Sequence, residues 1–81
     1  MKRTAYLINV TRGEIVHEES VVEALRQGLI AGAGLDVTPR EPMPPDSPLW
    51  KMDNVLIGCH TAGASPLRAG RTVDRFCRNL V

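Results

Sequence analysis

Four side chains of this sequence have the chemistry needed to reduce a carbonyl group or oxidise an alcohol: Arg12, Asp36, Glu41 and His60. The guanidinium of Arg12 could bind a carboxylate through paired hydrogen bonds and polarise an adjacent carbonyl. The imidazole of His60 could give and take a proton near neutral pH. A carboxylate hydrogen-bonded to that imidazole, such as Glu41, would stabilise its charged form and fix its tautomer.

Each of these residues also has an ordinary structural interpretation. Arg12 could be a solvated turn residue, and Glu41 could be a solvated charge in a loop rich in proline. Asp36 could be a turn or cap residue, and His60 could have a purely structural role. The elements that carry these residues decide whether they form a shared site.

The chain alternates between strand-like and helix-like segments. Residues 5–10 form a continuous β-prone run, which is typical of a strand buried on both faces in a parallel sheet. Acidic residues open the next segment and Gly28 follows it, as at the two ends of a helix. The elements that we predict are a strand at 5–10, a helix at 18–27, a strand at 30–37, a proline-rich loop at 39–48, a strand at 54–58 and a helix at 66–81.

The last predicted helix has a clear start and an apolar stripe. Ser65 and Pro66 are residue types that favour the N-cap and the first position of a helix. The apolar residues that recur at helical spacing behind them are Val73, Phe76, Cys77 and Leu80. We therefore expect Cys77 to be a core residue.

These elements predict an α/β fold, a partial Rossmann-type parallel sheet that is a fragment of a larger doubly wound domain. No G-x-G-x-x-G follows a strand, and three buried strands are few for a parallel sheet. Ligands of open α/β sheets bind outside the carboxyl ends of the strands, where Arg12, Asp36 and His60 would converge. An acid at such a strand end could hold a nicotinamide amide or a ribose.

Composition narrows the class of protein. With 81 residues, 43% apolar residues and a net charge of +1, the chain fits one small globular domain or part of one. No apolar run approaches the roughly 18 residues of a membrane span, and the 2 cysteines are too few for a disulfide scaffold. We expect a cytoplasmic protein with free thiols, no metal, and neither nucleic acid nor membrane as partner.

Four linked motifs, in this order and spacing, resemble the D-2-hydroxyacid dehydrogenases. They are LINVTRG at 7–13, AGAGLDV at 31–37, EP at 41–42 with SPLW at 47–50, and NVLIGCHTAG at 54–63. The resemblance runs over nearly the whole chain. It implies that residues 1–81 are the C-terminal portion of that family's dinucleotide-binding domain.

The resemblance also implies a role for each candidate residue. Arg12 would bind the substrate carboxylate, His60 would be the catalytic acid/base, and Glu41 would be its carboxylate partner. Asp36 would contact the nicotinamide carboxamide. The cofactor-binding residues that it implies are Val10, Thr11, Arg12, Asp36, His60 and Gly63. The implied reaction interconverts small 2-oxo acids and D-2-hydroxy acids by hydride transfer with NAD or NADP, usually in a dimer.

Several departures from the family pattern affect these expectations. Gly58 and Cys59 stand where the family usually has Thr-Pro, which could loosen the strand end and misplace His60. His17 stands where the family's helix usually begins with aspartate, which costs about 1 kcal/mol of capping. The glycine-rich fingerprint and the substrate domain are not among these 81 residues. We therefore expect the chain alone to be an inactive fragment of such an oxidoreductase.

A different class of function remains open, that of a non-enzymatic remnant acting as a protein-interaction module. Helices at 18–27 and 66–81 could cover only part of the sheet, so we expect pairing with a second copy or with the remainder of the domain. The P-x-x-P pattern of the loop could suit polyproline recognition, and the arginines of the last helix could suit nucleic acid. A connecting loop and a solvated helix face are the simpler interpretations.

Overall fold

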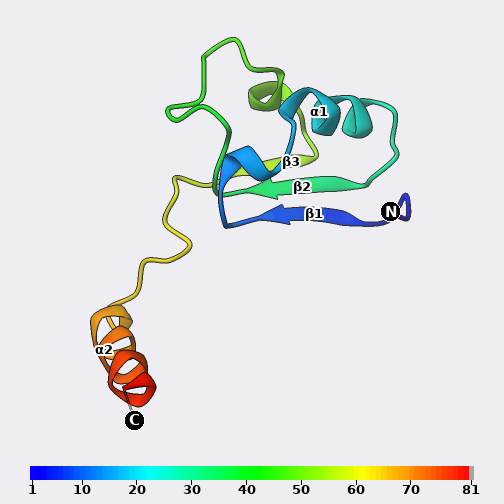
Figure 1. Ribbon diagram of the computed structural model, residues 1–81. Helices are drawn as coiled ribbons and strands as arrows, with labels where there is room; N and C mark the ends of the chain where they lie inside the picture. Colours follow the sequence, from blue (N-terminus) through cyan, green and yellow to red (C-terminus); the bar gives the residue numbers. More distant parts are fainter. Residues whose placement is uncertain (81) are drawn as a thin grey trace.

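Three short parallel strands form one open sheet in the computed structural model, which describes residues 1–80 (Figure 1). The strands are β1 (Tyr6–Asn9), β2 (Gly32–Leu35) and β3 (Val55–Ile57). β2 lies in the centre and pairs in parallel with both neighbours, so that Leu35 lies between Asn9 and Ile57. The predicted parallel α/β sheet is therefore confirmed.

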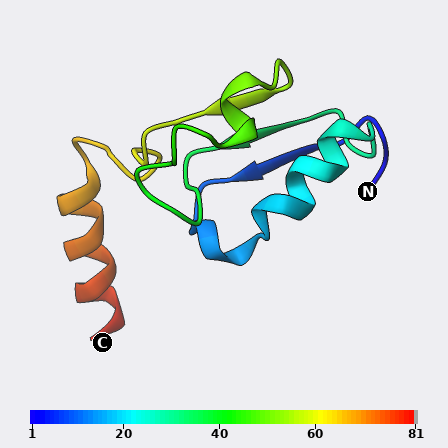
Figure 2. The same cartoon turned by 90° about the horizontal axis from the view of Figure 1, so that it is seen from above.

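All of the elements that cover the sheet lie on one of its faces (Figures 1 and 2). They are α1 (Glu18–Arg26), which connects β1 to β2, and the long loop that ends in the 3₁₀ helix η2 (Pro48–Lys51). A second 3₁₀ turn, η1 (Gly13–Ile15), links β1 to α1. The Ser47 hydroxyl donates to Glu18 Oε1 at 3.1 Å, which ties the start of η2 to the start of α1.

The core is the layer between these elements and the sheet. Its buried members are Val21, Val22 and Leu25 from α1, Ile30, Ala33 and Leu35 from or beside β2, and Leu49 from η2. Leu25 and Leu49 are only 4% and 2% exposed. Burying one such side chain contributes about 1.5–3 kcal/mol to the free energy of unfolding. This single layer therefore provides the main stabilisation of the body of the chain, by which we mean the sheet, α1 and η2.

The two ends of α1 differ in how their backbone groups are capped. His17 is the N-cap and makes no side-chain hydrogen bond to the backbone, as expected from its replacing an aspartate. Its Nδ1 instead lies 2.9 Å from the Ser20 hydroxyl. At the other end, Gly28 has a φ of 65°, so the predicted left-handed C-cap glycine is confirmed.

The C-terminal end of α1 closes with the two hydrogen bonds of a Schellman motif. The N–H of Gly28 donates to the carbonyl of Leu25 at 3.2 Å, and the N–H of Leu29 donates to that of Ala24 at 2.9 Å. Leu29 follows Val21 and Leu25 at helical spacing in the sequence, but it lies in this turn and is 44% exposed.

The other face of the sheet is bare, which corrects the prediction of strands buried on both faces. Tyr6, Ile8 and Leu56 point to this face and are 68%, 64% and 76% exposed. The continuous apolar run was typical of a two-sided strand, but α1, the loop and η2 all lie on one side (Figure 1).

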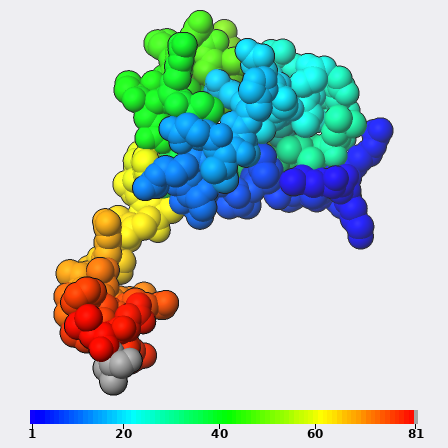
Figure 3. Space-filling model, in the orientation of Figure 1, coloured from blue at the N-terminus to red at the C-terminus, as the bar shows by residue number. Residues whose placement is uncertain are grey.

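The last helix, α2 (Arg68–Asn79), projects away from the sheet and covers none of it (Figures 1 and 3). Its residues are exposed throughout, with Phe76 at 63% and Val73 at 59%. The prediction that Cys77 is a core residue is therefore wrong, because the stripe on which it lies meets no other element.

Most of the observed strands and helices are shorter than predicted. β2 covers 32–35 rather than 30–37, although Ile30 and Val37 are buried just beyond its ends, which explains their strand-like pattern. α2 begins at Arg68 rather than at the predicted 66, although the Ser65 hydroxyl accepts a hydrogen bond from the Leu67 N–H, as an N-cap residue does, in the turn before α2. Residue 81, the predicted end, lies outside the described residues.

Candidate functional site

A buried asparagine shapes the turn that carries Arg12. Asn9 ends β1 and is 3% exposed. Its Nδ2 donates to the carbonyl of Arg12 at 2.9 Å, and its Oδ1 accepts from the N–H and the hydroxyl of Thr11 at 3.1 and 2.9 Å. The turn that begins with Val10 is thereby fixed, and Arg12 leaves the sheet at the carboxyl end of β1.

A second buried polar residue shapes the loop that carries Glu41. The N–H of Thr38 donates to Glu41 Oε1 at 3.3 Å, and its hydroxyl donates to the carbonyl of Arg40 at 2.6 Å. Thr38 is 7% exposed and lies just after β2. One carboxylate oxygen of Glu41 is thus occupied by the backbone, and the other remains for a partner.

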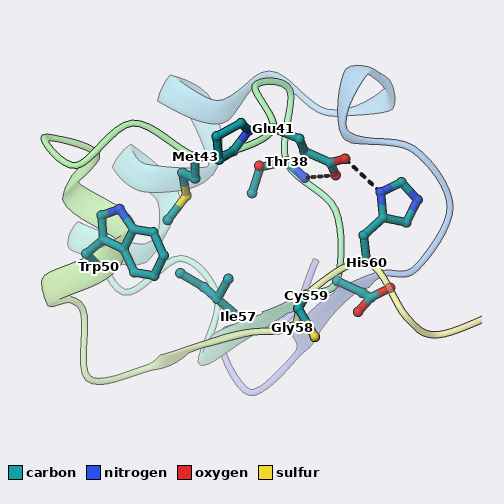
Figure 4. A pocket seen from close by; sticks show the side chains of 10 residues that line it. Thr38, Glu41, Met43, Trp50, Ile57, Gly58, Cys59 and His60 are labelled. Carbon is teal, nitrogen blue, oxygen red and sulfur yellow. Dashed lines mark hydrogen bonds and ion pairs between the residues drawn. The ribbon is translucent and has the colours of Figure 1, made fainter.

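That partner is His60, whose Nδ1 lies 2.7 Å from Glu41 Oε2 (Figure 4). An ionised carboxylate only accepts hydrogen bonds, so Nδ1 carries the proton and Nε2 is left for a substrate oxygen. The hydrogen bond from His60 lowers the pKa of Glu41 below its ordinary value of 4.5, more than partial desolvation raises it. The structure therefore brings His60 and Glu41 together as the hydrogen-bonded pair that was expected from the sequence.

The carboxylate of Asp36 lies at the end of β2 and binds the loop that follows His60. Its Oδ2 accepts from the N–H of Ala62 at 2.9 Å, and its Oδ1 accepts from the N–H of Thr61 at 3.2 Å. The hydrogen bond from Ala62 is the main cause that lowers the pKa of Asp36 below its ordinary value of 3.8.

Arg12 and the His60–Glu41 pair line the same hollow of about 250 Å³. This hollow is lined by Arg12, Gly13, Glu14, Thr38, Pro39, Glu41 and His60. The positive charge of Arg12 is a minor cause of the lowered pKa of Glu41, so the two groups lie within electrostatic reach. A cation, an imidazole and a carboxylate from three separate segments therefore surround one space.

A larger hollow of about 340 Å³ lies on the other side of the pair and is mostly apolar (Figure 4). Met43, Trp50 and Ile57 line its apolar side, and Cys59, which precedes His60 in the chain, also lines it. This hollow separates η2 from the end of β3.

The remaining predicted residues lie along the same edge. Val10 is 54% exposed and precedes Thr11 in the turn after β1. Gly63 lies in the turn after His60, and no atom lies within 4 Å of the position that a Cβ there would take. The structure thus brings Arg12, Glu41 and His60 together and leaves Gly63 at the margin.

Sequence reasoning missed two positioning residues, Asn9 and Thr38. Both have a local signal that could have been used. An asparagine that ends an apolar run and begins a turn favours an Asx-turn, in which its side chain bonds to the backbone two residues on. A threonine directly after a buried strand has the same ability, although more weakly.

The arrangement offers anion binding at Arg12 and proton transfer at His60. Among residues 1–80, no three His, Cys, Asp or Glu side chains are placed so that they could share a metal ion. Within the same residues, no helix has the length and apolar character needed to cross a membrane.

The chain matches known proteins over these same segments. The family model for the D-isomer specific 2-hydroxyacid dehydrogenase, NAD binding domain, matches residues 1–62. A glyoxylate reductase of Korarchaeum cryptofilum is 47% identical over all 81 residues, which span only 24% of that relative. A glyoxylate reductase/hydroxypyruvate reductase of Mus musculus is 48% identical over 65 residues, 80% of this chain and 20% of that relative.

Solved structures agree with these sequence matches. A D-isomer specific 2-hydroxyacid dehydrogenase from Xanthobacter autotrophicus, in complex with NADPH and MES, superposes with a TM-score of 0.79 at 46% identity, covering 96% of this chain and 33% of that one. D-lactate dehydrogenase with NAD⁺ from Lactobacillus jensenii superposes with a TM-score of 0.77 at 32% identity, covering 96% and 27%. The chain therefore belongs to the D-isomer specific 2-hydroxyacid dehydrogenase family.

Proposed function

We propose that this chain is the acid/base portion of an NAD(P)-dependent oxidoreductase that interconverts small 2-oxo acids and D-2-hydroxy acids. The observation that carries the proposal is the 2.7 Å hydrogen bond between His60 Nδ1 and Glu41 Oε2 beside Arg12. The two relatives named above are glyoxylate or hydroxypyruvate reductases, which favours a 2-oxo acid with a short side chain.

The roles follow from the chemistry of each group. Arg12 binds the carboxylate of the 2-oxo acid through its guanidinium and polarises the neighbouring carbonyl. In reduction, His60 in its charged form donates the proton on Nε2 to the carbonyl oxygen as that oxygen gains negative charge, and in oxidation Nε2 takes the proton back. Glu41 stabilises the imidazolium through Nδ1 and keeps the ring oriented.

The residues present fit the nicotinamide end of NAD or NADP. The carboxylate of Asp36 already accepts two amide N–H groups, so its chemistry suits a carboxamide N–H as well. Val10, Thr11 and Gly63 would provide further contacts along the same edge. A nicotinamide cofactor, when bound, supplies or accepts the hydride.

A segment-replacement chimera tests this proposal. In the Korarchaeum cryptofilum glyoxylate reductase, the matching 24% of the chain is replaced by these 81 residues. We expect glyoxylate-dependent oxidation of NADH or NADPH, and we expect His60→Asn to lower kcat by about 10²–10⁴-fold. His17→Asn is the matched control, because His17 lies at the start of α1 and outside the site.

Two results would contradict the proposal. One is a folded chimera that binds the cofactor but does not reduce glyoxylate, and the other is a His60→Asn variant with the parent rate. We further propose that the 81 residues alone do not turn over, because they carry no G-x-G-x-x-G loop for the cofactor's pyrophosphate. Glyoxylate reduction by the purified 81-residue chain would overturn that statement.

A further inference from the structure

The backbone at His60 has an unusual conformation. His60 has a φ of 60°, and it is the non-glycine residue with positive φ among residues 1–80. A residue with a Cβ adopts this left-handed region at a cost in free energy, so surrounding contacts must hold it there. The Glu41 hydrogen bond holds the ring, which leaves the question of what holds the backbone.

The contact that holds the backbone comes from Asp36, at the end of the neighbouring strand β2. Its two carboxylate oxygens accept the N–H groups of the two residues that follow His60, Thr61 at 3.2 Å and Ala62 at 2.9 Å. A carboxylate that accepts two backbone N–H groups makes charge-assisted hydrogen bonds, which are stronger than bonds between neutral groups. The carboxylate therefore restrains the chain directly after the unusual φ.

Gly58 is what leaves room for this carboxylate. The N–H of Gly58 donates to the carbonyl of Leu35 at 2.8 Å, which places Gly58 directly beside Asp36. A Cβ at Gly58 would lie 2.5 Å from Asp36 Oδ1 and 3.4 Å from Asp36 Cγ. Since Asp36 is short and both of its oxygens are hydrogen-bonded, it could not yield to a Cβ without losing contacts to the loop.

We propose that Asp36 is a positioning residue that holds the loop after His60, and that Gly58 makes this possible by lacking a Cβ. The inference rests on the proposed role of His60 and adds the contact that orients it. The absence of the family's usual Thr-Pro before the histidine is thereby balanced by a carboxylate clamp. Each carboxylate oxygen has a second lone pair, so the clamp leaves Asp36 able to accept a carboxamide N–H.

Acid titration of the ¹³C,¹⁵N-labelled 81-residue chain, followed by NMR, tests the clamp without any assay of activity. We expect the amide proton shifts of Thr61 and Ala62 to change with pH and to share the midpoint of the Asp36 carboxyl carbon. Asp36→Asn should remove this pH dependence. Asp46→Asn, at an exposed carboxylate in the loop, should keep it. Amide shifts of Thr61 and Ala62 that do not follow Asp36 would overturn the proposal.

A double-mutant cycle in the chimera tests the role of Gly58. Gly58→Ala and Asp36→Ala should each lower kcat, by up to about 10²-fold for a misplaced acid/base. The KM for glyoxylate should change little, because Arg12 sets it. Gly58→Ala should have no further effect once Asp36 is alanine, since the clash is with Asp36 itself.

Additive effects of the two substitutions, or a Gly58→Ala variant with the parent kcat, would contradict the clamp. Neither result would touch the proposed function, which the parent chimera and its His60→Asn variant test separately.

Discussion

At the scale of single residues, the site depends on two carboxylates that accept hydrogen bonds, those of Glu41 and Asp36. Glu41 binds His60 and Thr38, and Asp36 binds the backbone of Thr61 and Ala62. Both groups have a lowered pKa, because these hydrogen bonds favour the ionised form. Protonation of these carboxylates at low pH therefore weakens the contacts that orient His60.

The direction of this pH effect can be worked out. A carboxyl group whose pKa is lower in the folded chain than in the unfolded chain stabilises the fold above its unfolded value and loses that contribution as the pH falls through its folded value. The ordinary values are 4.5 for Glu41 and 3.8 for Asp36. The contribution of these two groups to the free energy of unfolding should thus be constant above about pH 5 and should decrease below it.

Urea unfolding of the chain at a series of pH values measures this dependence. The double variant Asp36→Asn with Glu41→Gln should show a shallower decrease below pH 4.5, whereas Asp46→Asn should follow the parent. An identical slope for the double variant and the parent would show that these two carboxylates do not couple to folding.

The site could be predicted from the sequence as far as topology determines it. Parallel strands end at one edge, so Arg12, Asp36 and His60 had to lie near each other once the strands were recognised. Whether Glu41 reaches His60 depends on the path of a loop with many prolines, which no periodicity describes. The clamp at Gly58 depends on an atom that glycine lacks, so it is visible only in three dimensions.

At the scale of elements, the ends of the two helices determine how each responds to substitution. α1 is packed on the core and closes with a left-handed glycine, whereas α2 is exposed and has a glycine, Gly70, in its first turn. Substitution of glycine by alanine should therefore destabilise the end of α1 and stabilise α2.

Gly28→Ala should destabilise the body, by about 1–2 kcal/mol for a left-handed residue with a Cβ. Nothing lies within 4 Å of the added Cβ, so the cost is conformational and not a clash. Thermal or urea unfolding measures it. A variant as stable as the parent would show that the Schellman motif at the end of α1 contributes little.

Gly70→Ala is the matched change in α2. Alanine is favoured over glycine within a helix by up to about 1 kcal/mol, and nothing beyond the neighbouring helix backbone lies within 4 Å of the added Cβ. Circular dichroism at 222 nm should show more helix, while the unfolding of the body stays unchanged because α2 does not pack on it. A shift in the unfolding midpoint of the body would indicate that α2 docks on it in solution.

The element scale also shows where sequence patterns mislead. The stripe on α2 has helical spacing and does form a helix, but amphipathicity does not identify the surface that it covers. The run at 5–10 does form a strand, but a continuous apolar run cannot tell whether the second face is covered within the same chain. Both errors concern contacts between elements and not the elements themselves.

At the scale of the whole molecule, the chain is much less compact than a self-contained domain. Its radius of gyration is 16.1 Å, whereas about 12 Å is expected for a compact domain of this length. The projecting α2 accounts for the difference (Figure 3). The bare sheet face adds a large exposed apolar surface that includes Tyr6, Ile8 and Leu56. Large exposed apolar surfaces of this kind are uncommon on soluble monomers.

We expect the 81-residue chain to associate with a second copy through the bare sheet face. Ile8→Lys and Leu56→Lys, which lie on the two outer strands on either side of Gly34, should shift the chain toward monomer in sedimentation experiments at micromolar concentration. Arg71→Ala on α2 is the control and should leave association unchanged. A parent chain that sediments as a monomer would show that the bare face is tolerated in solution.

The pH dependence of kcat in the chimera tests the central claim most directly, the claim that Glu41 supports His60 as the proton donor. In reduction His60 must be charged, so the rate should fall at high pH. Glu41→Gln removes the carboxylate that stabilises the imidazolium, so this fall should move to lower pH while cofactor binding is retained. A Glu41→Gln chimera with the parent rate and an unchanged pH profile would contradict the account.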